Sequence, residues 1–195
     1  MTLFNNHTSD NIFQDFEQKF KPILYQKYPH LSTLHIDCYT VVQYNQQKNI
    51  PLIDGLCNDT FAYSIDVTND GEQNKVFAAI VISPELCESF NFTEMEKMAA
   101  ISHEVGHIIH HFNEALSKAG NMMVEIKADE VVAKLGMAEP LKSVLHKLKS
   151  SNRYSKEQCQ LMDLRIQMLS CSDDCWYYSI IQLINSEFQE IVLPL

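Results

Sequence analysis

The feature that most constrains this chain is the run His-Glu-Val-Gly-His at residues 103–107, inside a segment with strong helical character. Residues four apart lie on one face of a helix, so the imidazoles of His103 and His107 can converge on one tetrahedral ion. Glu104 lies about 100° further round the helix, where it can take a proton from a metal-activated water. The pattern HExxH therefore predicts a zinc-binding helix with its own general base.

Two local signals describe the helix that carries this run. Thr93 and Glu96 stand three residues apart, which is a capping-box pattern, and they predict where the helix begins. Gly106 lies inside the motif, although glycine costs a helix about 1 kcal/mol relative to alanine. Its presence indicates that another element packs very close to this turn.

A third zinc ligand has to be sought outside the motif, because catalytic zinc takes three protein ligands and keeps one position open. A histidine six residues after His107 is one known arrangement, but the residue there is Asn113. His110 shares the face of the two histidines, yet its ring would have to reach back past His107. The remaining candidate is a carboxylate from the next predicted helix.

That next helix is predicted over residues 122–136 and carries Glu125 and Asp129, four apart and so on one face. Glu125 can complete a set of two histidines and one glutamate. Asp129, one turn further, can accept the far N–H of a ligand histidine, a contact that fixes the ring. The alternative is a solvated acidic face. Beside HExxH, we favour the metal site.

The combined pattern resembles the gluzincin metallopeptidases of the M48 type, which carry HExxH and then ExxAD on a following helix. The resemblance covers about residues 76–150. The matching positions are His103, Glu104, His107, Glu125, Ala128 and Asp129. It implies Zn²⁺ held by the two histidines and Glu125, with Glu104 as general base and Asp129 as the orienter of His103. It also implies a zincin-like fold in which an edge strand pairs with an extended peptide or protein substrate.

The chain departs from this family in two ways. Many members have membrane helices, but no run of 18 apolar residues occurs here, so the chain looks like their minimal soluble relatives. The family also carries a later His-Pro and an arginine near the cleft, and only the arginine has a counterpart. His146, Tyr154 and Arg165 are the candidates to stabilise an oxyanion, a role whose loss costs roughly 10²–10³ in rate.

Two other interpretations stay open. The segment "VFAAIVISPEL", together with "SHEVGHIIHH", is similar to the ImmA/IrrE-type peptidases, which cleave or control repressors. Those proteins often carry a basic helix-turn-helix, which this sequence does not show. A catalytically silent zinc-bound binding or regulatory module is the second alternative, with the apolar tail 188–195 covering the cleft.

The expected fold class is α+β and zincin-like, with a small, mostly antiparallel sheet packed on the active-site helix and a helical C-terminal half. We expect a helix over 9–28 that Pro22 kinks or ends, a strand over 34–44, and a hairpin of 61–67 and 76–82 with Asp70-Gly71 in its turn. Further helices are expected over 138–150, 156–170 and 174–187. The chain is read as one domain, 1–195, made of an N-terminal helix (1–30), a sheet region (34–83), zinc-binding helices (93–136) and a helical part (138–195).

The composition limits partners and location. The net charge is −10, and Arg153 and Arg165 are the only arginines, so a nucleic-acid partner is not expected. The first residues lack the pattern of an export signal, and the six cysteines are scattered without a CxxC pair. We therefore expect reduced thiols, no membrane span and a cytoplasmic location, while nothing predicts the oligomeric state.

Overall fold

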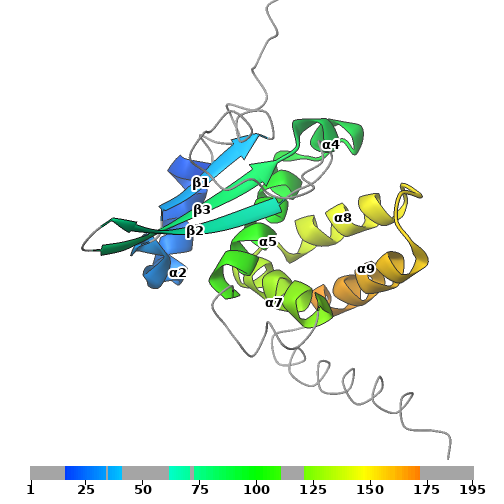
Figure 1. Ribbon diagram of the computed structural model, residues 1–195. Helices are drawn as coiled ribbons and strands as arrows, with labels where there is room; N and C mark the ends of the chain where they lie inside the picture. The colour runs from blue at the N-terminus through cyan, green and yellow to red at the C-terminus, as the bar shows by residue number, and fades with distance from the viewer. Residues whose placement is uncertain (1–15, 34, 41–61, 71–72, 111–120, 172–195) are drawn as a thin grey trace, which may run out of the picture.

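The computed structural model describes residues 16–33, 35–40, 62–70, 73–110 and 121–171, in which helices dominate and three strands form a sheet (Figure 1). The elements in chain order are the π-helical turn η1 (Phe16–Phe20), α2 (Lys21–Lys27), the 3-10 turn η2 (Pro29–Thr33), β1 (His35–Thr40), β2 (Ala62–Asp70), β3 (Gln73–Ile82), α4 (Pro84–Ser89), α5 (Glu94–His110), α7 (Asn121–Lys134), α8 (Ala138–Lys149) and α9 (Lys156–Leu169). The expected order of a helix, a small sheet and then helices is confirmed, and the fold class is α+β.

Of the helix expected over 9–28, the structure describes the part from Phe16, which continues past Pro22 to Lys27; residues 9–15 lie outside the described residues. Pro22 lies in the first turn of α2, directly after the π-helical turn η1. A proline is tolerated in a first turn because the N–H that it lacks has no helical partner at that position. Phe16, Phe20 and Leu24, spaced four residues apart, are at most 5% exposed and form the buried face of this segment.

The sheet has the strand order β1-β3-β2 and is mixed rather than mostly antiparallel. β2 and β3 pair antiparallel with Asp70 opposite Gln73, so two residues connect them and the predicted hairpin is confirmed. Its strands run three residues further toward the turn than expected, and Asp70 is the last residue of β2 rather than part of the turn. β1 pairs parallel with β3, with His35 opposite Phe77. The expected mostly antiparallel sheet is not confirmed, because β1 lies beside β3 and runs in the same direction. The end of β1 and the start of β2 lie at the same end of β3, since Thr40 is opposite Ile82 and Ala62 is opposite Val81.

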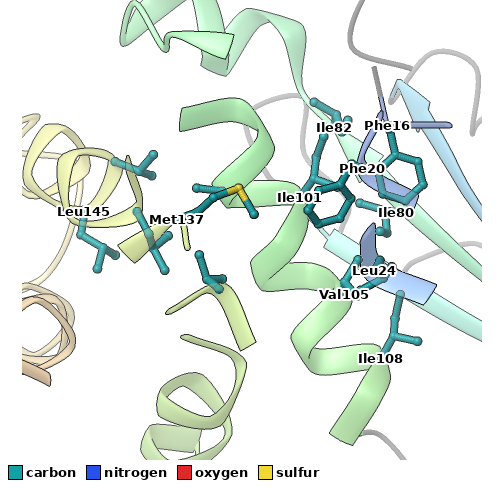
Figure 2. Close-up of a cluster of buried hydrophobic side chains, with 14 of the residues drawn as sticks. Phe16, Phe20, Leu24, Ile80, Ile82, Ile101, Val105, Ile108, Met137 and Leu145 are labelled. Carbon is teal, nitrogen blue, oxygen red and sulfur yellow. The ribbon is translucent and has the colours of Figure 1, made fainter. Parts of the chain in front are cut away.

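The central strand β3 is buried along its second half. Ala78, Ile80 and Ile82 point to one face and join the core formed with the N-terminal helix and α5 (Figure 2). Ala79 and Val81 point to the other face and are also buried. A strand buried on both faces is expected to be a continuous apolar run, which is what the sequence has here.

Helix α5 lies between the sheet and the C-terminal helices (Figure 1), in contact with β2 and β3 and also with α7 and α8. The predicted capping box begins it: the Thr93 amide donates to Glu96 at 2.6 Å, and the Glu96 amide donates to the Thr93 hydroxyl at 3.2 Å. Every residue from Ala99 to Ile108 is buried. Ile101, Val105 and Ile108 face the sheet side of the core (Figure 2). The two histidines of the motif therefore sit inside the protein.

The helices that follow agree with the sequence prediction. α7, α8 and α9 begin and end within two residues of their predicted bounds, and Gly136 closes the turn after α7 with a φ of 81°. The helix expected over 174–187 and the apolar tail 188–195 lie outside the described residues. In the ranges that the structure covers, no helix has the length and apolar character to cross a membrane.

Candidate metal centre

His103 and His107 meet on one face of α5, as the four-residue spacing predicts. Their Nε2 atoms are 3.0 Å apart, and the two rings stand nearly perpendicular, at 81°. Each residue is 8% exposed. Helix α5 thus brings two imidazole nitrogens together at a nearly buried position.

Glu125 of α7 reaches the same point. Its Oε2 lies 3.2 Å from Nε2 of His103, and its Oε1 lies 3.4 Å from Nε2 of His107. One donor atom from each of the three residues falls within 4.8 Å of the others. The expected partner from the next helix is therefore brought to the two histidines.

The spacing of these donor atoms suits a tetrahedral metal ion. Zinc binds imidazole nitrogen and carboxylate oxygen at roughly 2.0–2.2 Å, which places two ligand atoms of a tetrahedron about 3.3 Å apart. The two Nε2 atoms, 3.0 Å apart, are close to that edge length, and each lies 3.2–3.4 Å from a different oxygen of the Glu125 carboxylate. Two imidazoles and one carboxylate are also a ligand set that catalytic zinc takes. The residues present therefore fit the ion.

Asp129 lies behind His103, one turn along α7 from Glu125. Its Oδ1 is 2.8 Å from Nδ1 of His103, and the carboxylate is fully buried. An imidazole that donates Nδ1–H to this oxygen turns its Nε2 lone pair toward the cluster. The geometry is the one that the resemblance implies for the orienter of His103.

Arg165 of α9 completes the group from a third helix. Its Nε and Nη2 lie 2.7 and 2.8 Å from the two oxygens of Asp129, and its Nη1 lies 2.8 Å from Oε2 of Glu125. Arg165 is one of the three candidates that the sequence offers for stabilising an oxyanion. In the structure its guanidinium forms ion pairs with the carboxylates of Asp129 and Glu125.

The close approach of α5 and α7 depends on Gly106. A β-carbon at this position would lie 2.6 Å from the α-carbon of Ala128 and 2.7 Å from its carbonyl oxygen. The absence of that side chain lets the two helices meet at backbone level. The prediction of tight packing at Gly106 is confirmed, and its neighbour is the alanine between Glu125 and Asp129.

The charges of the cluster shift its protonation equilibria. Burial raises the pKa of Glu104 to about 7, against the His103 charge, which lowers it. Burial and the His103 charge together lower the pKa of His107 to about 4. Burial would raise the pKa of Glu125, but hydrogen bonding and charge from His103, with the Arg165 charge, bring it to about 2. Near neutral pH, Glu104 is thus poised to exchange a proton, and His107 is neutral.

The other candidates of the sequence lie elsewhere. His110 is half-buried near the end of α5 and is not among the three clustered ligand residues. His146 is exposed on α8, and Tyr154 is half-buried in the turn before α9. His111 lies outside the described residues.

The bonds of Arg165 are what sequence reasoning missed. Met162, Met168 and Leu169 are buried with Arg165 on one face of α9, at helical spacing. An arginine on an apolar face needs a buried anionic partner, and that was the signal available in the sequence. It does not say which acid the partner is.

No family model, no curated protein and no solved structure matches the chain in the comparisons with known proteins.

Proposed function

We propose that the protein is a zinc-dependent endopeptidase. The observation that carries this proposal is the convergence of His103, His107 and Glu125, with donor atoms 3.0–3.4 Å apart, beside the buried carboxyl of Glu104. Two imidazoles and a carboxylate leave the fourth position of a tetrahedral ion open for water or substrate. A site closed by four protein ligands would instead favour a structural role.

Each residue has a defined task in this proposal. His103, His107 and Glu125 would hold the zinc, and Asp129 keeps the His103 ring in place. A bound zinc would supply Lewis acidity, which lowers the pKa of water and polarises a carbonyl group. Glu104 takes the proton of the attacking water, a transfer suited to a group whose pKa burial raises to about 7.

The position of the sheet favours a polypeptide as the substrate. β2 stands at one edge of the described sheet and contacts α5, the helix of the two histidines. An extended peptide can add to such an edge through main-chain hydrogen bonds, which read side chains only through adjoining pockets. We expect a peptide or protein substrate. A repressor as the substrate and a cytoplasmic location stay predictions from the sequence.

Metal analysis of the purified protein tests the first step. We expect about one zinc per chain, and we expect the variant His103→Ala to lose it. The control is His110→Ala, which removes a half-buried histidine of the same helix that is outside the cluster and should leave the zinc content unchanged. A wild-type protein that is purified without chelator and takes up no zinc contradicts the proposal.

One observation favours a silent zinc-bound module as the second candidate. His103, Glu104 and His107 are each only 8% exposed, which leaves little surface for a substrate to touch. Peptide-library cleavage by the full chain and by a chain shortened by residues 188–195 separates the two candidates. If either protein cleaves peptides, and the Glu104→Gln substitution abolishes that cleavage, the result supports the peptidase. If both proteins bind zinc and neither cleaves any peptide, the result supports the silent module.

A further inference from the structure

We propose that Arg165 is a positioning residue of the metal centre, which fixes two of its carboxylates before an ion binds. This inference rests on the zinc site of the proposed function, but not on peptide cleavage. It assigns a task to α9, which contributes no ligand to the three-residue cluster.

The guanidinium group binds Asp129 in a bidentate way. Nε donates to Oδ2 at 2.7 Å, and Nη2 donates to Oδ1 at 2.8 Å. Two parallel charge-assisted bonds fix the plane of a carboxylate as well as its position. Lysine cannot make this contact, because its ammonium group is a single point of charge.

The orientation of Asp129 passes to a zinc ligand. Oδ1 of Asp129 lies 2.8 Å from Nη2 of Arg165 and also 2.8 Å from Nδ1 of His103. The same guanidinium reaches Oε2 of Glu125 through Nη1 at 2.8 Å. Arg165 therefore holds one zinc ligand directly and another through the aspartate.

Burial makes this contact strong and its loss costly. Asp129 is fully buried and Arg165 is 9% exposed, so water cannot replace either partner. Removing one member of a buried ion pair leaves an uncompensated charge in the interior. Without Arg165, we expect Asp129 to move toward another partner or toward water, and the His103 ring to follow it.

The test compares zinc affinity in wild type, Arg165→Lys and Arg165→Met, measured by competition with a chromophoric chelator. Loss of a group that orients a ligand typically weakens metal binding about 10–100-fold. We expect a weakening in that range for both variants, together with an altered visible absorption spectrum of the Co²⁺-loaded protein, which reports ligand geometry. The control is Arg153→Met, which removes the exposed arginine that lies over the Phe90 ring. We expect it to keep wild-type affinity and spectrum.

The outcomes separate this inference from the proposed function. If wild type binds no divalent metal, both fail. If wild type binds zinc, and Arg165→Lys has the same affinity within twofold and the same Co²⁺ spectrum, only the role of Arg165 is wrong. If the affinity falls as expected but no peptide is cleaved, the positioning role stands and the peptidase does not. If Arg165→Met fails to fold, the zinc affinity and Co²⁺ spectrum of Arg165→Lys decide the question. If Arg165→Lys also fails to fold, the proposal is overturned, because Arg165 is then needed for the fold itself.

Discussion

Gly106 and Ala128 bring helices α5 and α7 together at backbone level. A β-carbon on Gly106 would lie 2.6 Å from the Ala128 α-carbon. His107 follows this glycine directly, and Ala128 stands between Glu125 and Asp129. The contact thus sets the distance between the histidines of one helix and the carboxylates of the other.

The variant Gly106→Ala should therefore weaken both the fold and the metal site. The added β-carbon meets backbone at 2.6 Å, so we take the upper end of the overpacking cost, about 3 kcal/mol, of which the better helix propensity of alanine returns about 1 kcal/mol. For a chain of this size the net loss of about 2 kcal/mol lowers the Tm by roughly 4–8 °C, and we also expect weaker zinc binding. Thermal unfolding and chelator competition measure the two effects.

A double variant tests the cause of that fall. The atoms nearest to the added methyl group belong to the Ala128 backbone, not to its side chain. Gly106→Ala combined with Ala128→Gly should therefore be no more stable than Gly106→Ala alone. Recovery of the wild-type Tm in the double variant would show that the close approach is made by the side chain of Ala128.

The variant Glu104→Gln should keep its zinc and lose peptide cleavage. Glutamine has nearly the same shape but cannot take a proton from water, and loss of a general base typically costs about 10²–10⁴ in rate. Zinc content and the rate of peptide cleavage are measured on the same preparation. Glu94→Gln, at the exposed start of the same helix, is the control and should cleave at the wild-type rate. Full activity in Glu104→Gln would exclude Glu104 as the base.

The variant Asp129→Asn should bind zinc about 10–100-fold more weakly than wild type, because it disturbs the group that orients His103. Glu130→Gln is the matched control, since this neighbouring acid is paired with Lys127 and Lys134 at 2.6 Å each. We expect the control to change zinc affinity by less than twofold. If the two variants bind zinc with equal affinity, Asp129 does not orient a zinc ligand.

Acid should destabilise the protein partly through Glu96. Burial opposes its ionisation, but bonds from Lys147, Ser143 and Thr93 outweigh that effect and lower the pKa from 4.5 to about 2. Because the pKa is lower in the folded state, ionised Glu96 stabilises the fold above pH 4.5. This contribution to the free energy of unfolding is at most about 3 kcal/mol, and it is lost as the pH falls toward 2. Urea unfolding from pH 6 to pH 2 should show a smaller acid loss in Glu96→Gln than in wild type. Glu94→Gln should keep the wild-type slope.

The parts of the fold and site that follow from local sequence were predictable. The four-residue spacing placed His103 beside His107 and put Glu125 and Asp129 on one helix face, and Thr93 marked the start of α5. These relations depend on helix geometry alone. Gly106 indicated a close neighbour because glycine is unfavourable inside a helix, but only the structure identifies that neighbour as Ala128.

The remaining features depend on contacts between distant segments. Turn chemistry predicts the β2–β3 hairpin, but it says nothing about the direction of β1, which no short turn joins to its neighbour. Periodicity places Arg165 on the buried face of α9 and leaves its partner undetermined. The packing of α9 on α7 decides which groups Arg165 contacts, and in the structure these are the carboxylates of Asp129 and Glu125.

The reach of Arg165 to His103 also sets an order of events during synthesis. The two residues are 62 positions apart in the chain. At about 5–20 residues per second, a ribosome needs roughly 3 to 12 seconds to travel between them. The ribosome therefore makes both histidines seconds before it makes Arg165. On the proposed role of Arg165, high-affinity metal binding is expected only after residue 165 has been synthesised.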